Sequence, residues 1–180
     1  MRYTVNKDFQ FGIPELDSLD FTGKRVIVVT CHRRENYGQP MQDIMHAILE
    51  VVNSHPDVEV VYPVHLSPVV RECAFPILGG HERIHLIDPV NVEQMHNLMS
   101  RCYMVMTDSG GLQEEAPALG KPVLVMRRET ERPEAVAAGT AKLAGGEKDT
   151  IVKLASELLD SPEAYAKMAK AVNPYGDGHA

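Results

Sequence analysis

The segment Thr107-Asp-Ser-Gly-Gly111 carries the sharpest chemical signal in this 180-residue chain, because it lies between a predicted strand and a predicted helix. Glycines in such a turn let the backbone approach a ligand, and the free N–H groups and the dipole at a helix start favour a phosphate group. The Ser109 hydroxyl can add a donor. A tight turn with an Asp or Ser cap explains the same residues, and the segment is neither a Walker loop nor a complete dinucleotide fingerprint.

Three further side chains have the chemistry of an anion-binding or acid–base site. Glu115, one turn into the helix after that segment, can accept hydrogen bonds from a ribose diol, although an acid there also suits the helix dipole. His32 follows a buried strand, and this position favours an acid, base or phosphate-donor role over an exposed loop histidine. Arg132 can bind phosphate in a bidentate manner or can pair with Glu129 or Glu131 at the surface.

One metal-binding pattern is rejected. The segment His81-Glu-Arg-Ile-His85 matches the H-E-x-x-H pattern of zinc enzymes, which requires a helix. Two glycines precede the segment and apolar residues continue to Ile87, so a loop entering a strand is predicted here. Along a strand the two histidines would be about 13 Å apart, too far to share one metal ion. We therefore predict no metal site.

The elements that must position these residues alternate between strands and helices. The predicted strands are 25–30, 58–62, 84–87, 103–107, 122–126 and 141–143. The predicted helices are 41 to the residue before Pro56, 92–101 with Asn91 as its cap, 112–119, 149–159 and 162–171. This alternation predicts an α/β fold with a doubly wound parallel sheet, in which ligands bind beyond the carboxyl ends of the strands. Residues 1–23 lack such a pattern and are predicted to be an irregular linker or arm, so residues 24–180 form one domain.

The loops after the predicted strands gather cationic and hydroxyl groups on one edge of an acidic protein. They hold His32, Arg33, Arg34, His65, Ser109, Arg127, Arg128 and Arg132. The whole chain has 18 Lys and Arg against 25 Asp and Glu, a net charge of −7, which argues against nucleic acid or an anionic membrane as a partner. No apolar run reaches the ~20 residues that span a bilayer. The three widely spaced cysteines indicate a reduced, cytoplasmic setting, and nothing beside Cys31 supports a thiol nucleophile.

Several sequence blocks, in order, resemble the C-terminal half of bacterial, non-hydrolysing UDP-N-acetylglucosamine 2-epimerases. They are His32-Arg-Arg-Glu-Asn36, Pro63-Val-His-Leu66, Asp108-Ser-Gly-Gly111 with Gln113-Glu-Glu-Ala-Pro117, Gly120-Lys-Pro122, Thr130-Glu-Arg-Pro-Glu134 and Asn173-Pro-Tyr-Gly-Asp-Gly178. The resemblance implies a Rossmann-like domain that is half of a GT-B-like two-domain fold. It also implies an isomerase that interconverts UDP-GlcNAc and UDP-ManNAc by anti elimination of UDP and re-addition to a glycal.

The resemblance also implies a role for each motif. The diphosphate would be bound by Ser109, Gly110 and Gly111. Glu115 would bind the ribose hydroxyls. His32 and Arg132 would flank the phosphates, and His32 would be the catalytic residue of this chain by steadying the UDP leaving group.

Two further pairs of residues are implied by the same resemblance. Val90 and Met95 match positions near the uracil, although the family commonly has a polar residue at the first and an aromatic residue at the second. Arg33 and His65 match positions that line a second, allosteric UDP-GlcNAc site between the domains.

The family's base and acid are carboxylates of an N-terminal domain, and we expect no such domain before Met1 here. This chain alone should therefore bind UDP weakly and have little or no epimerase activity. We expect no cofactor and no metal, and a homodimer for the full-length protein, which would serve cell-envelope polysaccharide synthesis. Two alternatives stay open: the nucleotide half of a GT-B glycosyltransferase, and a non-catalytic nucleotide-binding module.

Overall fold

The computed structural model describes residues 12–17, 19, 21, 23–31, 37–108, 121–126, 141–143 and 148–169. Its strands are β1 (Arg25–Thr30), β2 (Val58–Pro63), β3 (Ile84–Ile87), β4 (Met104–Thr107), β5 (Val123–Val125) and β6 (Ala141–Leu143). Its helices are α1 (Pro14–Asp17), α2 (Gln39–Ser54), α3 (Pro68–Leu78), α4 (Val92–Arg101), α7 (Lys148–Asp160) and α8 (Pro162–Ala169). The strand predictions are confirmed to within one residue at each end. The predicted helix 112–119 lies outside the described residues.

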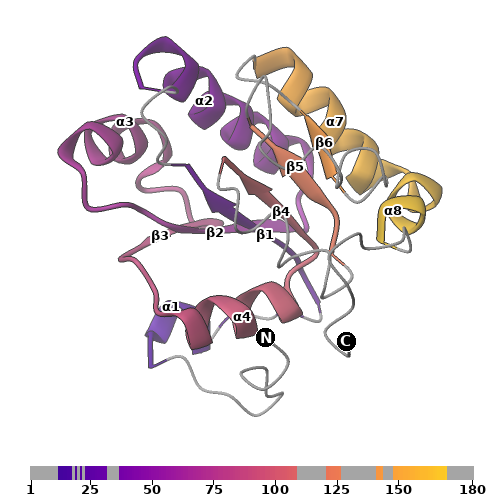
Figure 1. Ribbon diagram of the computed structural model, residues 1–180, viewed down its shortest axis with the longest axis horizontal. Coiled ribbons are helices and arrows are strands. Elements are labelled where there is room, and N and C mark those ends of the chain that lie inside the picture. The colour runs from indigo at the N-terminus through magenta and orange to yellow at the C-terminus, as the bar shows by residue number, and fades with distance from the viewer. Residues whose placement is uncertain are drawn as a thin grey trace.

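The six strands form one parallel sheet in the order β3-β2-β1-β4-β5-β6 (Figure 1). Valine and isoleucine dominate β1, whose residues from Val26 onward are buried, because β-branched side chains pack well on both faces of a covered sheet. The register pairs Thr30 with Thr107 and Pro63 with Ile87, so these strands end together on one edge. This order is that of a Rossmann-like sheet, which confirms the predicted fold class.

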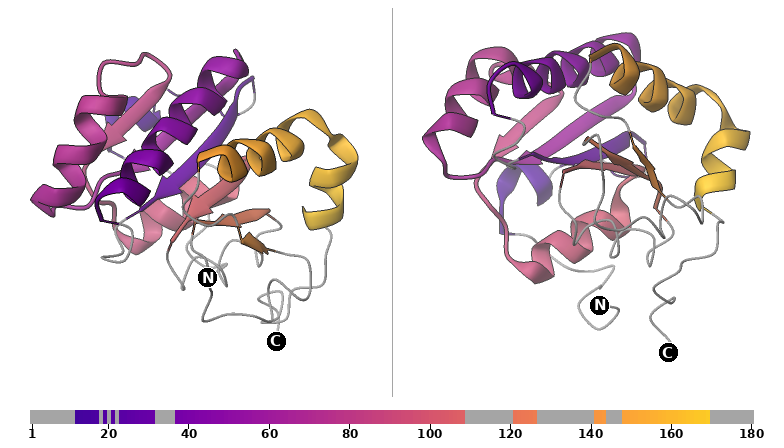
Figure 2. Two further views of the ribbon diagram at one scale, coloured as in Figure 1. Left: turned by 90° about the horizontal axis from the view of Figure 1, so that it is seen from above. Right: turned by 45° about the horizontal axis from the view of Figure 1, so that its top comes forward.

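Helices cover both faces of the sheet, as Figures 1 and 2 show: α2, α3, α7 and α8 lie on one face, and α1 and α4 lie on the other. Alternate residues of β1 point to two separate cores. Ile27 and Val29 pack in the core beneath α2 and α7, whereas Val26 and Val28 pack in the core above α4. The doubly wound arrangement therefore follows from the period-2 alternation of a strand whose two faces are both apolar.

Helix α3 was not predicted, because Pro68 and Pro76 interrupt the apolar pattern in its sequence. Pro68 occupies the first turn, where a missing N–H costs nothing. Pro76 lies in the last turn and removes one intrahelical hydrogen bond. The helix still forms, since Val70, Ala74 and Leu78 recur every four residues and are buried against the α2 side of the sheet.

The segment before β1 also differs from the predicted irregular arm. Pro14–Asp17 is a short helix, and Leu16 is only 1% exposed within the core on the α4 side. Leu19 and Phe21 pack against the same core. These apolar side chains attach the described part of this segment to the domain.

None of the helices in the described ranges has the length and apolar character needed to cross a membrane.

Candidate functional site

The carboxyl ends of β1 and β4 meet where the strand order reverses. From β1 the chain adds β2 and β3 on one side, and then β4, β5 and β6 on the other. Ligands of doubly wound sheets bind in the crevice outside the strand ends at this switch point. Its described residues are Thr30, Cys31, Thr107 and Asp108, all of them buried.

Two threonines join the strand ends at the switch point. The Thr30 and Thr107 hydroxyl oxygens are 2.6 Å apart, and the backbone N–H of Asp108 donates to the Thr30 carbonyl at 3.2 Å. On the other side of β4, the N–H of Met126 donates to the Thr107 carbonyl at 2.8 Å. Because neutral hydroxyls buried at this edge are paired with each other, they hold the two strands in register without introducing a charge.

Cys31 follows Thr30 in the chain and is buried. The Tyr62 hydroxyl donates to the Cys31 carbonyl at 2.8 Å, which ties the end of β2 to the end of β1. Burial, and after it the nearby Asp108 carboxylate, raises the pKa of the Cys31 thiol well above its usual value. A thiol held in its protonated form is a poor nucleophile, so the structure supports a packing role for Cys31.

At the end of β2, His65 is exposed and its ring Nδ1 accepts a hydrogen bond from the Ser67 backbone N–H at 3.1 Å. The proton of the neutral ring therefore resides on Nε2 in this arrangement. The Ser67 hydroxyl in turn accepts from Tyr37 at 3.4 Å. Next to it, Arg71 donates to the Asp88 carboxylate at 3.0 Å, which joins α3 to the loop after β3. His65 thus lies at the same edge as the switch point, two strands from β4.

Val90 and Met95 lie where β3 leads into α4. Both are half-buried and pack against the core on the α4 side. Between them Asn91 caps the helix as predicted: its side chain accepts from the Gln94 N–H at 2.7 Å, and the Gln94 side chain accepts from the Asn91 N–H at 2.9 Å. This reciprocal capping box fixes the first turn of α4, and with it Met95, at the carboxyl edge of the sheet.

The remaining predicted site residues lie outside the described residues: His32, Arg33, Ser109, Gly110, Gly111, Glu115 and Arg132. What the structure describes are the strand ends that lead into their segments, namely Cys31 after β1, Asp108 after β4 and Met126 after β5. Three adjacent strands therefore deliver three of the predicted segments to one edge.

The prediction that the H-E-x-x-H segment is a loop entering a strand is confirmed. His85 lies on β3 and His81 in the turn before it, so the two imidazoles do not share a helix face. His85 Nε2 is 2.9 Å from Glu59 Oε1 on β2, and His81 Nε2 is 3.0 Å from Asn53 Oδ1 on α2. Across the described ranges, no group of three or more His, Cys, Asp or Glu is placed to hold a metal ion.

The sequence profile of the family described as UDP-N-acetylglucosamine 2-epimerase matches residues 4–180. The chain belongs to this family. Within the UDP-N-acetylglucosamine 2-epimerases, which are isomerases, it is 57% identical to a putative member from Thermotoga maritima over 180 residues, covering all of this chain and 48% of that protein. It spans about half the length of the curated relatives it matches.

Several solved structures have the same fold as this chain. The Staphylococcus aureus MnaA–UDP co-structure superimposes with a TM-score of 0.91 at 46% identity, over 99% of this chain and 48% of that one. A Neisseria meningitidis UDP-GlcNAc 2-epimerase bound to UDP-GlcNAc gives 0.84 at 48% identity, over 86% and 42%. The C-terminal domain of a group 1 glycosyltransferase from Francisella tularensis matches at a TM-score of 0.64 and 16% identity, which shows the shared half of a GT-B-like fold alone.

Sequence reasoning missed Thr30 and Tyr62 as residues of the site, and it singled out Thr107 only as the first residue of the glycine-rich segment. Each ends or nearly ends a buried strand, and that position was the only available signal. Thr30 and Thr107 are 77 residues apart in the chain, so their contact depends on a strand pairing that no local pattern encodes.

Proposed function

We propose that this chain is the UDP-binding, C-terminal half of a UDP-GlcNAc 2-epimerase, with residues 24–180 as the binding domain. In this proposal the diphosphate binds at the switch point, to Ser109, Gly110 and Gly111. Glu115 binds the ribose, while His32 and Arg132 flank the phosphates. The full protein interconverts UDP-GlcNAc and UDP-ManNAc.

The single observation that carries this proposal is the junction of β1 and β4. His32 is two residues beyond Thr30, and Ser109 is two residues beyond Thr107. Since consecutive Cα atoms are about 3.8 Å apart, each candidate lies within about 8 Å of its threonine, and the two threonines touch. A histidine and a glycine-rich turn that leave adjacent parallel strands can approach one diphosphate from two sides.

Solved relatives support the choice of ligand. One at 46% identity is a co-structure with UDP, and another at 48% identity is bound to UDP-GlcNAc. Val90 and Met95, packed at the start of α4, supply the apolar surface on which a uracil ring would rest.

The proposed reaction divides its groups between two halves of the protein. A base removes the C2 proton of the sugar, the C1–O bond to UDP breaks, and the electron pair of the C2–H bond forms the glycal double bond. UDP leaves with the electrons of the C1–O bond, and this chain contributes by binding that anion. Re-addition of UDP and protonation from the opposite face of C2 complete the inversion. The carboxylates that would act on C2 come from the other half, so positioning by this chain alone does not suffice.

We also propose that His65 and Arg33 contribute to a second UDP-GlcNAc site that requires the other half. His65 is exposed at the carboxyl edge and held by Ser67, and Arg33 comes three residues after the end of β1. Both positions follow strand ends, and the carboxyl edge is the side of the domain where an interdomain cleft of a GT-B-like protein would lie.

Calorimetric titration of UDP into the 180-residue chain tests the binding proposal. The expected result is weak, saturable binding that the pair Ser109→Ala with Arg132→Ala weakens at least tenfold, because a hydroxyl contact and a charge-assisted contact to phosphate are lost. A matched control, Ser156→Ala with Lys153→Ala, removes a hydroxyl and a positive charge from α7 and should leave the affinity unchanged. Equal affinity in all three proteins would contradict the proposed site.

Incubation with UDP-GlcNAc in D₂O tests the division of labour. Elimination removes the C2 proton, and its reversal in D₂O would place deuterium at C2. Because the proposal assigns the base to the other half, we expect no deuterium at C2 with this chain alone. Efficient exchange or conversion would show that this chain holds its own base, and would overturn the assignment of the carboxylates to another half.

A further inference from the structure

A cavity of about 280 Å³ opens at the edge of the sheet opposite the switch point. Its walls come from the residues that lead into β1, β4 and β5, with α8 on one side. Lys24 and Arg25 belong to the start of β1, Lys121 lies before β5, and Arg101 ends α4. The amino ends of three neighbouring strands thus bring cationic side chains together from distant parts of the sequence.

The charge of this cavity is opposite to that of the protein. Four of its lining residues are cationic and, within the described ranges, none is acidic, while the whole chain has a net charge of −7. Arg25 is balanced by the Asp57 carboxylate, whose Oδ1 is 2.9 Å from Nη2. Lys24 and Lys121 bring two more ammonium groups to the walls, so the cavity has a local positive field that attracts and concentrates small anions.

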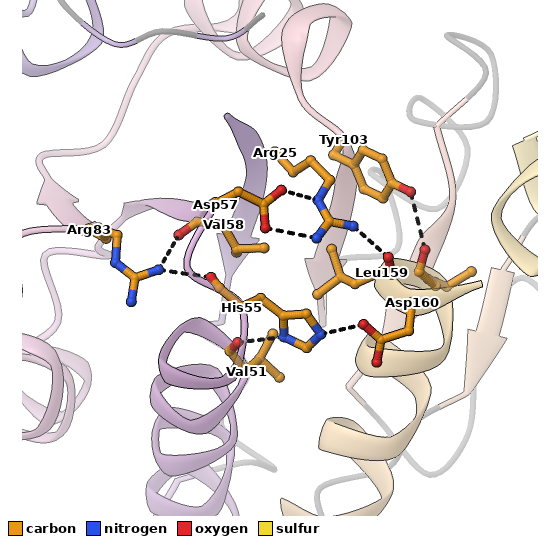
Figure 3. Close-up of polar contacts among 10 residues, drawn as sticks. Arg25, Val51, His55, Asp57, Val58, Arg83, Tyr103, Leu159 and Asp160 are labelled. Carbon is orange, nitrogen blue, oxygen red and sulfur yellow. Dashed lines mark hydrogen bonds and ion pairs between the residues drawn. The ribbon is translucent and has the colours of Figure 1, made fainter. Parts of the chain in front are cut away.

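The remaining walls are joined by hydrogen bonds and by an aromatic contact. Figure 3 shows the Arg25 guanidinium beside the Tyr103 ring, at 5.4 Å from its centroid, with the Tyr103 hydroxyl directed to α7. The Tyr103 hydroxyl donates to the Leu158 carbonyl at 3.2 Å, and the Tyr165 hydroxyl donates to the Tyr103 carbonyl at 2.8 Å. The two tyrosine rings pack with centroids 4.1 Å apart.

Neither of two titratable groups in these walls adds a negative charge at neutral pH. Burial raises the pKa of Cys102 to about 12 and that of Tyr165 to about 12. The Cys102 thiol donates to the Met99 carbonyl at 3.0 Å. An anion entering the cavity would therefore meet ammonium and guanidinium donors against a preformed aromatic wall.

We propose that this cavity is a second anion site, which takes a small phosphate-bearing ligand with two or more negative charges. Its volume of about 280 Å³, just below the roughly 300–1,000 Å³ of sites for drug-sized ligands, accommodates a phosphate, a pyrophosphate or a short phosphate ester. The aromatic pair gives the ligand's carbon portion, if any, a surface for contact. The site lies across the sheet from the proposed UDP site and does not depend on it.

Residue-resolved NMR with inorganic pyrophosphate as the probe tests this proposal. In the ¹⁵N-labelled chain, at constant ionic strength, we expect saturable shifts of the Cys102, Tyr103 and Tyr165 amide signals. Signals of Asp108 and Met126 report the opposite edge separately, so pyrophosphate bound at the proposed UDP site is distinguished. The double variant Lys24→Gln/Lys121→Gln should weaken the response at the cavity at least tenfold, because two ammonium donors are lost.

The control variant Lys148→Gln/Lys153→Gln removes two positive charges from α7, outside the cavity, and should keep the affinity within about twofold because exposed charges are screened over ~8–10 Å. Three results would overturn the proposal: shifts confined to Asp108 and Met126, shifts at the cavity that do not saturate, or equal weakening in both lysine pairs. Retention of the dispersed spectrum in both variants shows that each protein is folded.

Discussion

The Thr30 and Thr107 hydroxyl oxygens are 2.6 Å apart at the carboxyl ends of β1 and β4, and Thr107 is fully buried. This contact joins the two strands that lead into the proposed phosphate-binding segments. It uses two neutral hydroxyls, so the contact itself adds no charge beside the buried Asp108. In the proposed site, the threonine pair would hold in register the two strands that lead to His32 and to the glycine-rich turn.

The stability costs of removing the Thr30 and Thr107 hydroxyls should not be additive. We expect Thr30→Val and Thr107→Val each to lower the free energy of unfolding by about 1–3 kcal/mol, because the buried hydrogen bond between the two hydroxyls is lost. The double variant should cost less than the two single values added, by at least about 0.5 kcal/mol. Urea denaturation of the four proteins measures this coupling. Strict additivity would show that the two hydroxyls do not interact.

An aromatic residue at position 95 should tighten UDP binding. The family usually has an aromatic residue near the uracil, and Met95 is half-buried at the start of α4, where the capping box fixes the helix. Stacking contributes about 0.5–1.5 kcal/mol, so Met95→Phe should lower the Kd for UDP roughly twofold to tenfold. Met95→Leu, which keeps the volume without a ring, is the control. Equal affinity in both variants would place the uracil elsewhere.

Much of the fold could be predicted because several of its strands, β1 and β2 above all, are rich in β-branched residues. The run Arg25–Thr30 is an example whose bounds the structure reproduces. Helix α3 could not be predicted, since Pro68 and Pro76 are local breakers and the buried spacing of its apolar residues outweighs them only in the folded protein. Tertiary burial overrides propensity there.

The edge of the candidate site was predictable, whereas its contacts were not. His65 and Asp108 each follow a predicted strand, so both are expected at the carboxyl edge of a parallel sheet. The position of the switch point depends on which strands pair. The pairing of β1 with β4 is what brings Thr30 and Thr107 into contact there. The cationic cavity at the opposite edge was missed for the same reason: Lys24 and Lys121 approach only through the pairing of β1, β4 and β5.

The ion pair of Arg25 and Asp57 should contribute stability at neutral pH and lose it in acid. Arg25 hydrogen-bonds both oxygens of the Asp57 carboxylate and holds the pKa of Asp57 below its ordinary value of 3.8. Because this pKa is lower in the folded than in the unfolded chain, the contribution is present above pH 3.8 and is lost as the pH falls through the folded value.

The Asp57→Asn variant measures this contribution. We expect a loss of up to about 1 kcal/mol at pH 7, small because the Asp57 side chain is 46% exposed and solvent screens it. The difference in the free energy of unfolding between Asp57→Asn and the unmodified protein should decrease toward zero at low pH. Glu82→Gln, at an exposed position, is the charge-matched control. A difference that grows in acid would mean that folding raises the pKa of Asp57 instead of lowering it.

Removing the His55 side chain should destabilise the protein more than removing the Asp160 side chain, although the two form one contact. His55 Nε2 is 2.8 Å from Asp160 Oδ1, and Nδ1 is 2.9 Å from the Val51 carbonyl, which links α2 to α7 (Figure 3). The His55 side chain is 8% exposed and that of Asp160 is 66% exposed. Burial and the second contact should make His55→Ala cost about 2–3 kcal/mol and Asp160→Ala under about 1 kcal/mol. Equal losses in urea denaturation would contradict this.

The three cysteines should react with a thiol reagent in an order set by burial. All three are free; Cys31 and Cys102 are buried and Cys73 is half-buried. Burial raises the pKa of every one of these thiols, that of Cys31 far above its usual value and that of Cys102 to about 12. Only the thiolate reacts with the reagent, so we expect Cys73 to be labelled first in the native chain. Cys31 and Cys102 should be labelled only when the protein unfolds.

Timed labelling at pH 8, read by mass spectrometry of the peptides, follows this order. Cys73→Ser should abolish the fast phase and leave two slow thiols, whereas Cys102→Ser should leave the fast phase intact. In urea all three should react at one rate. Fast labelling of Cys31 in the native chain would instead expose the end of β1 to solvent, and would reopen the possibility of a reactive thiol beside His32.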